Sequence, residues 1–262
     1  MYRSLFASLG ERQSPINVIT EDVIFDPDIC KPSSMKFNYH EGDCHELVAL
    51  PSTWMLRTND QCKSSLTASH LSGEFRLLQV HGHWGETAEG GSEHAIDSRR
   101  YSSEVFPLNP FQMLKVDSNL SAILRYTSPS GTPTINWTMR HIMVMEGKHN
   151  KHYAHISDAI PEAVEKDTPV EISTSLDVAS LMPLDVFCPF SSSTLWRIPC
   201  FSMLVIHSAS LISSIEVPLS KGSDYLYYEG SLTTPPYSQC VLWTIMLEPV
   251  EVSSSQVRLE HI

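Results

Sequence analysis

Two histidines, His81 and His83, stand two residues apart in the stretch Q-V-H-G-H-W (79–84). In a β-strand both side chains would lie on one face, because alternate residues of a strand point the same way. Two imidazoles on one face can bind one metal ion, and imidazole nitrogen is a common ligand of zinc. A bare pair of this kind is more often an ordinary surface or core feature. The apolar residues around this pair favour a metal, since unpaired imidazoles are costly in a buried strand.

A second polar group follows in G-S-E-H (91–94), and a third in Y-Y-E-G-S-L-T-T-P-P (227–236). A carboxylate such as Glu93, placed near a metal, can anchor a hydroxyl or orient a ligand, although in isolation it is equally a solvated loop acid. Thr233 and Thr234 lie in a turn that glycine and a double proline make rigid. A threonine hydroxyl that donates to a carboxylate accepts from the group opposite, and would thereby orient a metal-bound hydroxide.

The composition excludes two classes of partner. The chain has 262 residues, 42% of them hydrophobic, with 30 acidic against 18 basic residues and a formal net charge of −12. This balance argues against nucleic acid, and the absence of a polybasic run argues against an anionic membrane surface. The longest uncharged stretch, 198–215, holds five serines, a histidine and a proline, which disfavours a membrane span.

The cysteines and the N-terminus bear on the cellular compartment. The six cysteines have no C-x-x-C spacing, so free buried thiols are expected rather than a disulfide framework. The first residues, M-Y-R-S-L-F-A-S-L-G-E-R-Q, lack the apolar core of a signal peptide. We therefore expect a cytoplasmic protein. The sequence does not indicate the oligomeric state.

The elements that must position these groups are mostly strands. Alternating or β-rich runs predict strands at 35–39, 75–84, 169–174 and 241–246. Residues 152–165 show helical spacing, with Pro161 as a break or turn. The simplest summary is a mainly β (α+β) protein with one twisted sheet and a few short helices.

Two segments, 105–140 and 186–223, show no clear strand or helix periodicity. They look like insertions between segments that do show it. In the first, F-P-L-N-P-F-Q (106–112) carries two prolines, which disfavour a central strand because proline cannot donate to the ladder.

Four motifs, taken together and in order, resemble those of the α-class carbonic anhydrases: G-E-R-Q-S-P-I-N-V (10–18), F-R-L-L-Q-V-H-G-H-W-G (75–85), G-S-E-H (91–94) and G-S-L-T-T-P-P (230–236). The resemblance implies a single domain over 1–262, built on a central, largely antiparallel twisted sheet with short peripheral helices. It also implies a Zn²⁺ cofactor, CO₂ and bicarbonate as substrates, and hydration of CO₂ as the reaction.

The resemblance also implies roles for individual residues. His81 and His83 correspond to two zinc ligands, and Glu93 to the acid that accepts a hydrogen bond from Thr233. Thr234 corresponds to a neighbour of that threonine in the substrate cleft. Supporting roles fall to six further residues: Leu232, Val241 and Trp243 in the hydrophobic wall where CO₂ rests, and Gln79, His94 and Tyr228 as hydrogen-bonding residues around the ligands.

The chain departs from the family pattern at the third zinc ligand. The stretch Y-S-S-E-V-F (101–106) ends in Phe106 where the family has histidine, and a phenyl ring cannot bind zinc. Gly82 also replaces an aromatic residue between the two histidines, and Ser52 stands near the position of the proton-shuttle histidine.

Three interpretations follow from these departures. The chain is a zinc carbonic anhydrase that is active if a third ligand exists, or a zinc-free, carbonic-anhydrase-related binding protein. The third interpretation is an inaccurate gene model of an active enzyme, with the errors confined to the two atypical segments.

Overall fold

The computed structural model describes residues 12–25, 35–50, 53–85, 87, 89–110, 137–173, 176–181, 203–205 and 225–259. Of the two atypical segments, residues 111–136 of the first and all but 203–205 of the second lie outside the described residues. The position of the proton-shuttle candidate, Ser52, also lies outside them.

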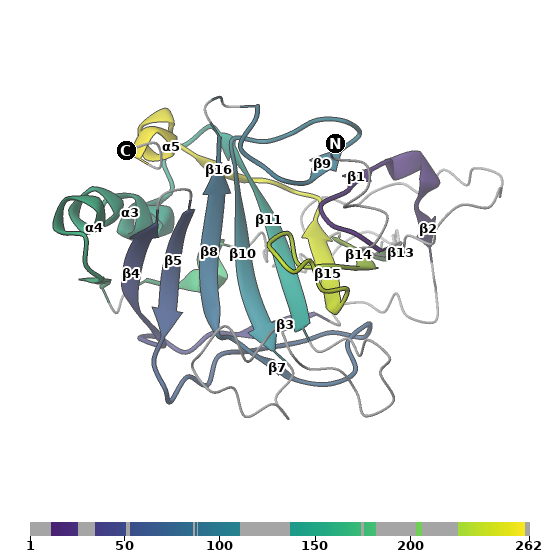
Figure 1. Ribbon diagram of the computed structural model, residues 1–262, viewed down its shortest axis with the longest axis horizontal. Helices are drawn as coiled ribbons and strands as arrows, with labels where there is room; N and C mark the ends of the chain where they lie inside the picture. The colour runs from purple at the N-terminus through teal and green to yellow at the C-terminus, as the bar shows by residue number, and fades with distance from the viewer. Residues whose placement is uncertain are drawn as a thin grey trace, which may run out of the picture.

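The elements are mostly short strands, shown in Figure 1, with three α-helices and two 3-10 turns among the described residues. In chain order they are β1 (Asn17–Val18), η1 (Thr20–Asp22), β2 (Ile24–Phe25), β3 (Lys36–Asn38), β4 (Cys44–Leu50), β5 (Thr53–Thr58), β6 (Ser65–Thr67), β7 (Phe75–Arg76), β8 (Gln79–Trp84), β9 (Ala95–Ile96), β10 (Ser103–Pro110), β11 (Trp137–Glu146), α3 (Lys151–Ser157), α4 (Ile160–Lys166), β12 (Val170–Glu171), η2 (Val178–Leu181), β13 (Met203–Val205), β14 (Tyr225–Gly230), β15 (Val241–Met246), β16 (Val250–Val252) and α5 (Ser254–Leu259).

One large sheet organises the chain. Its strands follow the order β12-β4-β5-β8-β10-β11-β15-β14-β13-β2, and β16 also pairs with β11. Most pairings are antiparallel, while β11 runs parallel to β15 and β16, and β13 runs parallel to β14. In Figure 1 the strands from β4 to β15 run side by side across the molecule, with the helices at one edge. The expected mainly β fold on a largely antiparallel sheet with short helices is confirmed.

The predicted strands all contain observed ones. The strand predicted at 241–246 coincides with β15, whose six residues are all buried. The run 75–84 divides into β7 and β8, and the run 35–39 contains β3. Only two residues of the run 169–174, those of β12, pair with β4 at the edge of the sheet.

The predicted helical region forms two helices. The side chain of Asn150 caps α3 by accepting hydrogen bonds from the backbone N–H groups of His152 and Tyr153. Pro161 lies in the first turn of α4, where its missing N–H leaves no intrahelical bond unmade. The helical region is therefore interrupted just before the proline. At its other end, Asp167 terminates α4 in a left-handed conformation, with φ of 49°.

The expectation that prolines exclude a central strand after residue 105 is wrong. Strand β10 runs through Pro107 to Pro110 between β8 and β11. On the β11 side the register passes from Val105 opposite Ile142 to Leu108 opposite Met139. On the β8 side Pro107 lies opposite Val80, so the pairing continues through the proline, and the burial of Val105 and Phe106 on the two faces offsets the missing N–H.

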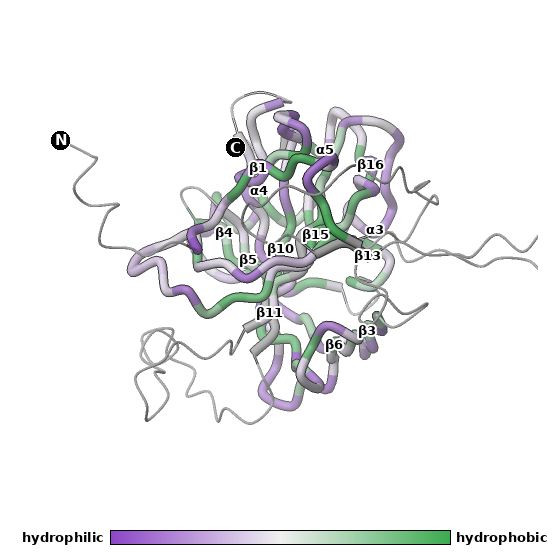
Figure 2. Tube along the Cα trace, turned by 90° about the vertical axis from the view of Figure 1, so that its right-hand side faces the viewer, coloured by the Kyte–Doolittle hydropathy of each residue, from purple (hydrophilic) through white to green (hydrophobic). Residues whose placement is uncertain are grey.

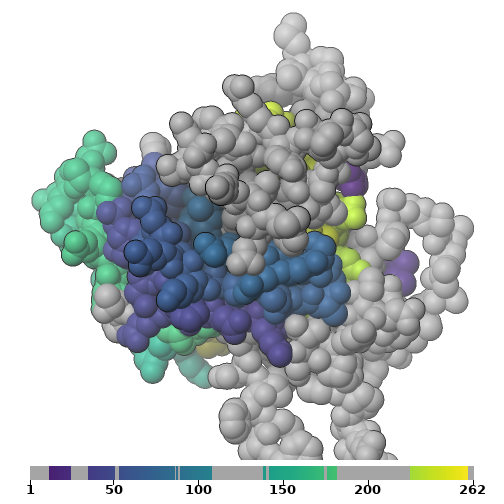
Figure 3. Space-filling view, turned by 90° about the horizontal axis from the view of Figure 1, so that it is seen from below, coloured from purple at the N-terminus to yellow at the C-terminus, as the bar shows by residue number. Residues whose placement is uncertain are grey.

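The hydrophobic side chains pack into two clusters, and Figure 2 shows hydrophobic segments gathered inside and hydrophilic ones on the outer loops. The first cluster joins α3 and α4 to the sheet, with Tyr153 edge-on to Trp54 at 6.4 Å between ring centroids. The second contains Phe106, Trp243 and Tyr228. In Figure 3, seen from below, residues from the first hundred positions form a continuous band with the helical residues at its edge.

Trp54 occupies the space beside the glycine that separates the two histidines. It lies opposite Gly82 in the pairing of β5 with β8 and is fully buried. A Cβ atom at Gly82 would lie 2.5 Å from the indole of Trp54. The indole thus fills room that a side chain at position 82 would need.

The described cysteines are free thiols, as expected. Cys44 and Cys62 are buried and Cys240 is half-buried, while Cys30, Cys188 and Cys200 lie outside the described residues. None of the described helices is both long enough and apolar enough to cross a membrane.

Candidate functional site

The two histidines of β8 share one face, and Phe106 of β10 lies beside both of them. The ring centroids of His81 and His83 are 5.3 Å apart. In the antiparallel pairing of β8 with β10, Phe106 lies opposite His81 and Glu104 lies opposite His83. The centroid of the Phe106 ring is 5.1 Å from that of His81 and 5.2 Å from that of His83. The face thus carries two imidazoles and one phenyl ring.

The environment of His81 favours a neutral imidazole. Burial and, to a smaller extent, the neighbouring His83 lower the pKa of His81 to about 3. Its Nδ1 atom is buried and has no hydrogen-bond partner, so Gln79 does not bond to it. A neutral imidazole with an unpaired buried nitrogen retains a lone pair or an N–H for a ligand.

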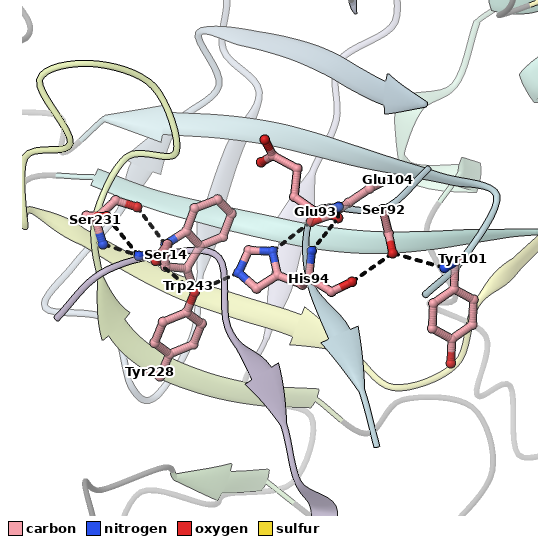
Figure 4. A network of polar contacts seen from close by, with 9 residues as sticks. All are labelled: Ser14, Ser92, Glu93, His94, Tyr101, Glu104, Tyr228, Ser231 and Trp243. Atoms are coloured by element: carbon pink, nitrogen blue, oxygen red, sulfur yellow. Dashed lines mark hydrogen bonds and ion pairs between the residues drawn. The ribbon is translucent and has the colours of Figure 1, made fainter. Parts of the chain in front are cut away.

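A buried polar network lies beside the histidine face (Figure 4). Nδ1 of His94 lies 2.8 Å from Oε1 of Glu104, and Nε2 of His94 lies 2.6 Å from the hydroxyl of Tyr228. That hydroxyl lies 2.8 Å from Oγ of Ser14, which accepts a hydrogen bond from the backbone N–H of Ser231. An ionised carboxylate only accepts, so a neutral His94 beside an ionised Glu104 carries its ring proton on Nδ1 and accepts from Tyr228 at Nε2.

Glu104 anchors the loop that precedes it as well as the ring of His94. Its Oε2 accepts hydrogen bonds from the backbone N–H groups of Glu93 and His94, the latter at 3.0 Å. Both Glu104 and His94 are fully buried. The carboxylate thereby fixes the backbone of G-S-E-H against β10.

The carboxyl group of Glu93 and the two threonines are not joined. Oε2 of Glu93 is buried and has no hydrogen-bond partner, so it does not bond to Thr233. Figure 4 shows no interaction at this carboxyl group. Thr233 is half-buried and Thr234 is exposed, both in the turn after β14. The side chain at position 93 therefore presents a buried acceptor without a donor, which is a costly state in the absence of a ligand or water.

The three predicted wall residues lie together. Leu232, Val241 and Trp243 are buried in the same cluster as Phe106. The ring of Trp243 is 5.4 Å from that of Phe106 and 4.8 Å from that of His94, between centroids. Nε1 of Trp243 donates to the backbone carbonyl of Ser231 at 3.0 Å, which fixes the orientation of the indole.

The donor set does not fit a three-ligand zinc site. Catalytic zinc sites use three protein ligands and one open position. His81 and His83 supply two imidazoles, and the third position on this face holds the phenyl ring of Phe106. In the part of the chain that the structure describes, no three His, Cys, Asp or Glu side chains are arranged to hold a metal ion.

Glu104, Ser14 and Ser231 belong to the site but were not singled out from the sequence. One signal was available for Glu104, because it stands two residues before Phe106 and shares its strand face. For the serines the sequence offers no signal, since Ser14 and Ser231 are 217 residues apart and meet only in the fold.

Comparison with known proteins connects this geometry to one family. A family profile described as eukaryotic-type carbonic anhydrase matches residues 4–200 and 202–260. Carbonic anhydrase 5B, mitochondrial, of Mus musculus is 30% identical over 249 residues, which cover 95% of this chain and 63% of the relative. Carbonic anhydrase 5A, mitochondrial, of Homo sapiens is 28% identical over 249 residues, 95% of this chain and 65% of the relative. Carbonic anhydrase 1 of Monodelphis domestica is 28% identical over 249 residues, 95% of this chain and 76% of the relative.

These relatives correct the expected location. The chain spans less than two thirds of the length of the 5A and 5B relatives, both of which are named mitochondrial. The expectation of a cytoplasmic protein is therefore wrong: it rested on the lack of a signal-peptide pattern, which carries no information about import into mitochondria.

Proposed function

Because the chain belongs to the eukaryotic-type carbonic anhydrase family, we propose that its substrates are CO₂ and bicarbonate and that its reaction is the reversible hydration of CO₂. The family match over 4–200 and 202–260 carries this proposal. The shared face of His81 and His83, beside the apolar cluster around Trp243, supports it. We also propose that residues 1–262 form one domain and that the protein is mitochondrial, as the names of its 5A and 5B relatives suggest.

In this proposal the chain's own residues have separate roles. His81 and His83 are metal-binding residues, and Val241, Trp243 and Leu232 form an apolar surface on which CO₂ rests. Glu93 supplies the buried acceptor that orients a hydroxyl group, with Thr233 as the donor that reaches it when the site is filled. Thr234 contacts substrate from the same turn, and Gln79, His94 and Tyr228 hold the surrounding side chains in place.

Carbonic anhydrases generally hold zinc on three histidines, where it activates water. The two imidazoles described here do not complete that set, so no step of the reaction is assigned through zinc.

One observation favours a second function, that of a non-catalytic binding protein. Phe106 is fully buried and occupies the position on the histidine face where a third donor would lie. A chain used only for binding needs the fold and the apolar surface but not the metal.

Rates of CO₂ hydration, measured by stopped flow with a pH indicator, separate the two functions. The purified chain is assayed with zinc titrated to saturation, beside a His81→Ala variant as matched control. A rate above the buffer reaction that the variant loses supports hydration. A rate equal to the buffer reaction at saturating zinc overturns it in favour of the binding protein.

A further inference from the structure

We infer that Phe106 is the residue that keeps this site from being a three-histidine zinc site, so that the native chain binds zinc weakly and Phe106→His makes it bind more tightly. The inference rests on the proposed function in one respect, since it takes His81 and His83 as the metal-binding pair. It adds that the residue at position 106 determines whether His81 and His83 bind zinc tightly.

The register places position 106 where a third donor must be. Phe106 lies opposite His81 across the β8–β10 pairing, and its ring is nearly equidistant from the two imidazoles, at 5.1 and 5.2 Å between centroids. A donor on that side chain would face both histidines from the neighbouring strand. The phenyl ring has no lone pair to offer and packs against both imidazoles instead.

The surroundings hold position 106 in place. Glu104, two residues earlier on the same face, accepts bonds from two backbone N–H groups and from His94. The Phe106 ring packs 5.4 Å from Trp243 and is fully buried, so it cannot swing aside to admit another ligand cheaply. An imidazole introduced at position 106 would be held in one orientation by the same backbone and the same packing. A fixed ligand orientation favours tight metal binding.

Two unpaired buried atoms belong to the residues around this site. Nδ1 of His81 and Oε2 of Glu93 are both buried without a hydrogen-bond partner. Buried polar groups are rarely left unpaired, and an exception calls for a functional explanation. Both atoms belong to residues that the proposed function assigns to the metal site.

The test is competition for zinc with a chromophoric chelator, using metal-free native chain, Phe106→His and, as matched control, Phe106→Leu. We expect Phe106→His to bind one zinc at least about 100-fold more tightly than the native chain, because even outer-shell partners are worth about 10–100-fold. Phe106→Leu, which also removes the ring but adds no donor, should bind no better than the native chain.

Several outcomes overturn the inference. Native chain that keeps one zinc through dialysis against the chelator shows a third ligand elsewhere, and this measurement stands even when Phe106→His does not fold. A folded Phe106→His that gains no affinity shows that position 106 does not face the metal. Equal gains in zinc affinity for Phe106→His and Phe106→Leu show that the phenyl ring weakens zinc binding by its size and not by the lack of a donor atom.

The hydration assay keeps the two proposals distinguishable. Phe106→His that gains both zinc and CO₂ hydration supports the inference and the proposed reaction. Phe106→His that gains zinc without hydration supports the inference and overturns the proposed reaction. Hydration by native chain with tightly held zinc supports the reaction and overturns the inference.

Discussion

His94 and Glu104 form a fully buried pair, with Nδ1 of the imidazole 2.8 Å from Oε1 of the carboxyl group. The pair ties the G-S-E-H loop to β10, and through Tyr228 and Ser14 it reaches the N-terminal segment. It therefore links the strand that carries Phe106 to three other parts of the chain. In the proposed function this network supports the site and takes no part in the reaction.

Removing His94 should destabilise the fold. In His94→Ala the buried carboxyl group of Glu104 and the hydroxyl of Tyr228 both lose a partner, and the free energy of unfolding should fall by about 3 kcal/mol. Urea denaturation followed by tryptophan fluorescence measures this. Lys166→Ala, which breaks an exposed pair with Glu162, is the control and should change little. A His94→Ala chain as stable as the native one would contradict the assigned support role.

A side chain at position 82 should be poorly tolerated. The Cβ of Gly82→Ala would lie 2.5 Å from the buried indole of Trp54, and such overpacking costs about 1–3 kcal/mol. Gly147→Ala is the matched control, because its Cβ would lie 3.0 Å from the flexible side chain of Glu251. Thermal unfolding of the two variants should show a clearly larger loss for Gly82→Ala. Equal losses would mean that Trp54 can move.

Low pH should destabilise the loop at Lys63 and Ser64, whose backbone N–H groups donate to Asp43. Burial acts to raise the pKa of Asp43, but hydrogen bonds from Ser64, Lys63 and Cys62 outweigh it and hold the pKa below its ordinary value. Oδ2 accepts from the backbone N–H groups of Lys63 and Ser64 at 2.8 and 2.7 Å. The native state thus binds the proton less readily than the unfolded state. The stabilisation is present above about pH 4 and is lost as the pH falls through the lowered value.

Asp43→Asn tests this dependence. The variant should be less stable than the native chain at pH 7, and the difference should shrink at pH 3, in urea denaturation at both pH values. Asp60→Asn, at an exposed position, is the control and should show no such convergence. A difference that stays constant with pH would rule out the carboxylate as its source.

Metal removal should not affect the native chain. The described residues offer no three-ligand group, so a chelator should leave the melting temperature of the native chain unchanged. Zinc-loaded Phe106→His should melt at a lower temperature once chelator is added, because a ligand that binds only the folded state stabilises it. Differential scanning calorimetry with and without chelator gives both values. A lower melting temperature for the treated native chain would reveal a metal site outside the described residues.

Several features of the site could be predicted from local sequence. The period of two along Q-V-H-G-H-W is enough to place His81 and His83 on one face, and the same period places Glu104 and Phe106 together on the next strand. The strand at 241–246 and the helical region around Pro161 were likewise predictable, because periodicity and proline act over a few residues.

The proline-rich stretch after Phe106 shows where local rules fail. Its prolines argued against a central strand, yet β10 runs between β8 and β11. The hydrophobic packing of Phe106 and Val105 on either face outweighs one missing ladder bond. Local propensity cannot predict that packing outweighs the missing bond, because the residues that pack against Val105 and Phe106 are distant in the sequence.

Local sequence accounts for the chemical groups of the site: two imidazoles on one strand face, a phenyl ring in place of a third donor, and the motifs of a carbonic anhydrase. Three contacts became known from the folded chain: the phenyl ring packs beside both imidazoles, Ser14 reaches Tyr228, and the carboxyl group of Glu93 has no donor. The reason is physical: a side chain's type and strand face are local properties, whereas contacts between strands depend on a register set by the packing of the whole sheet.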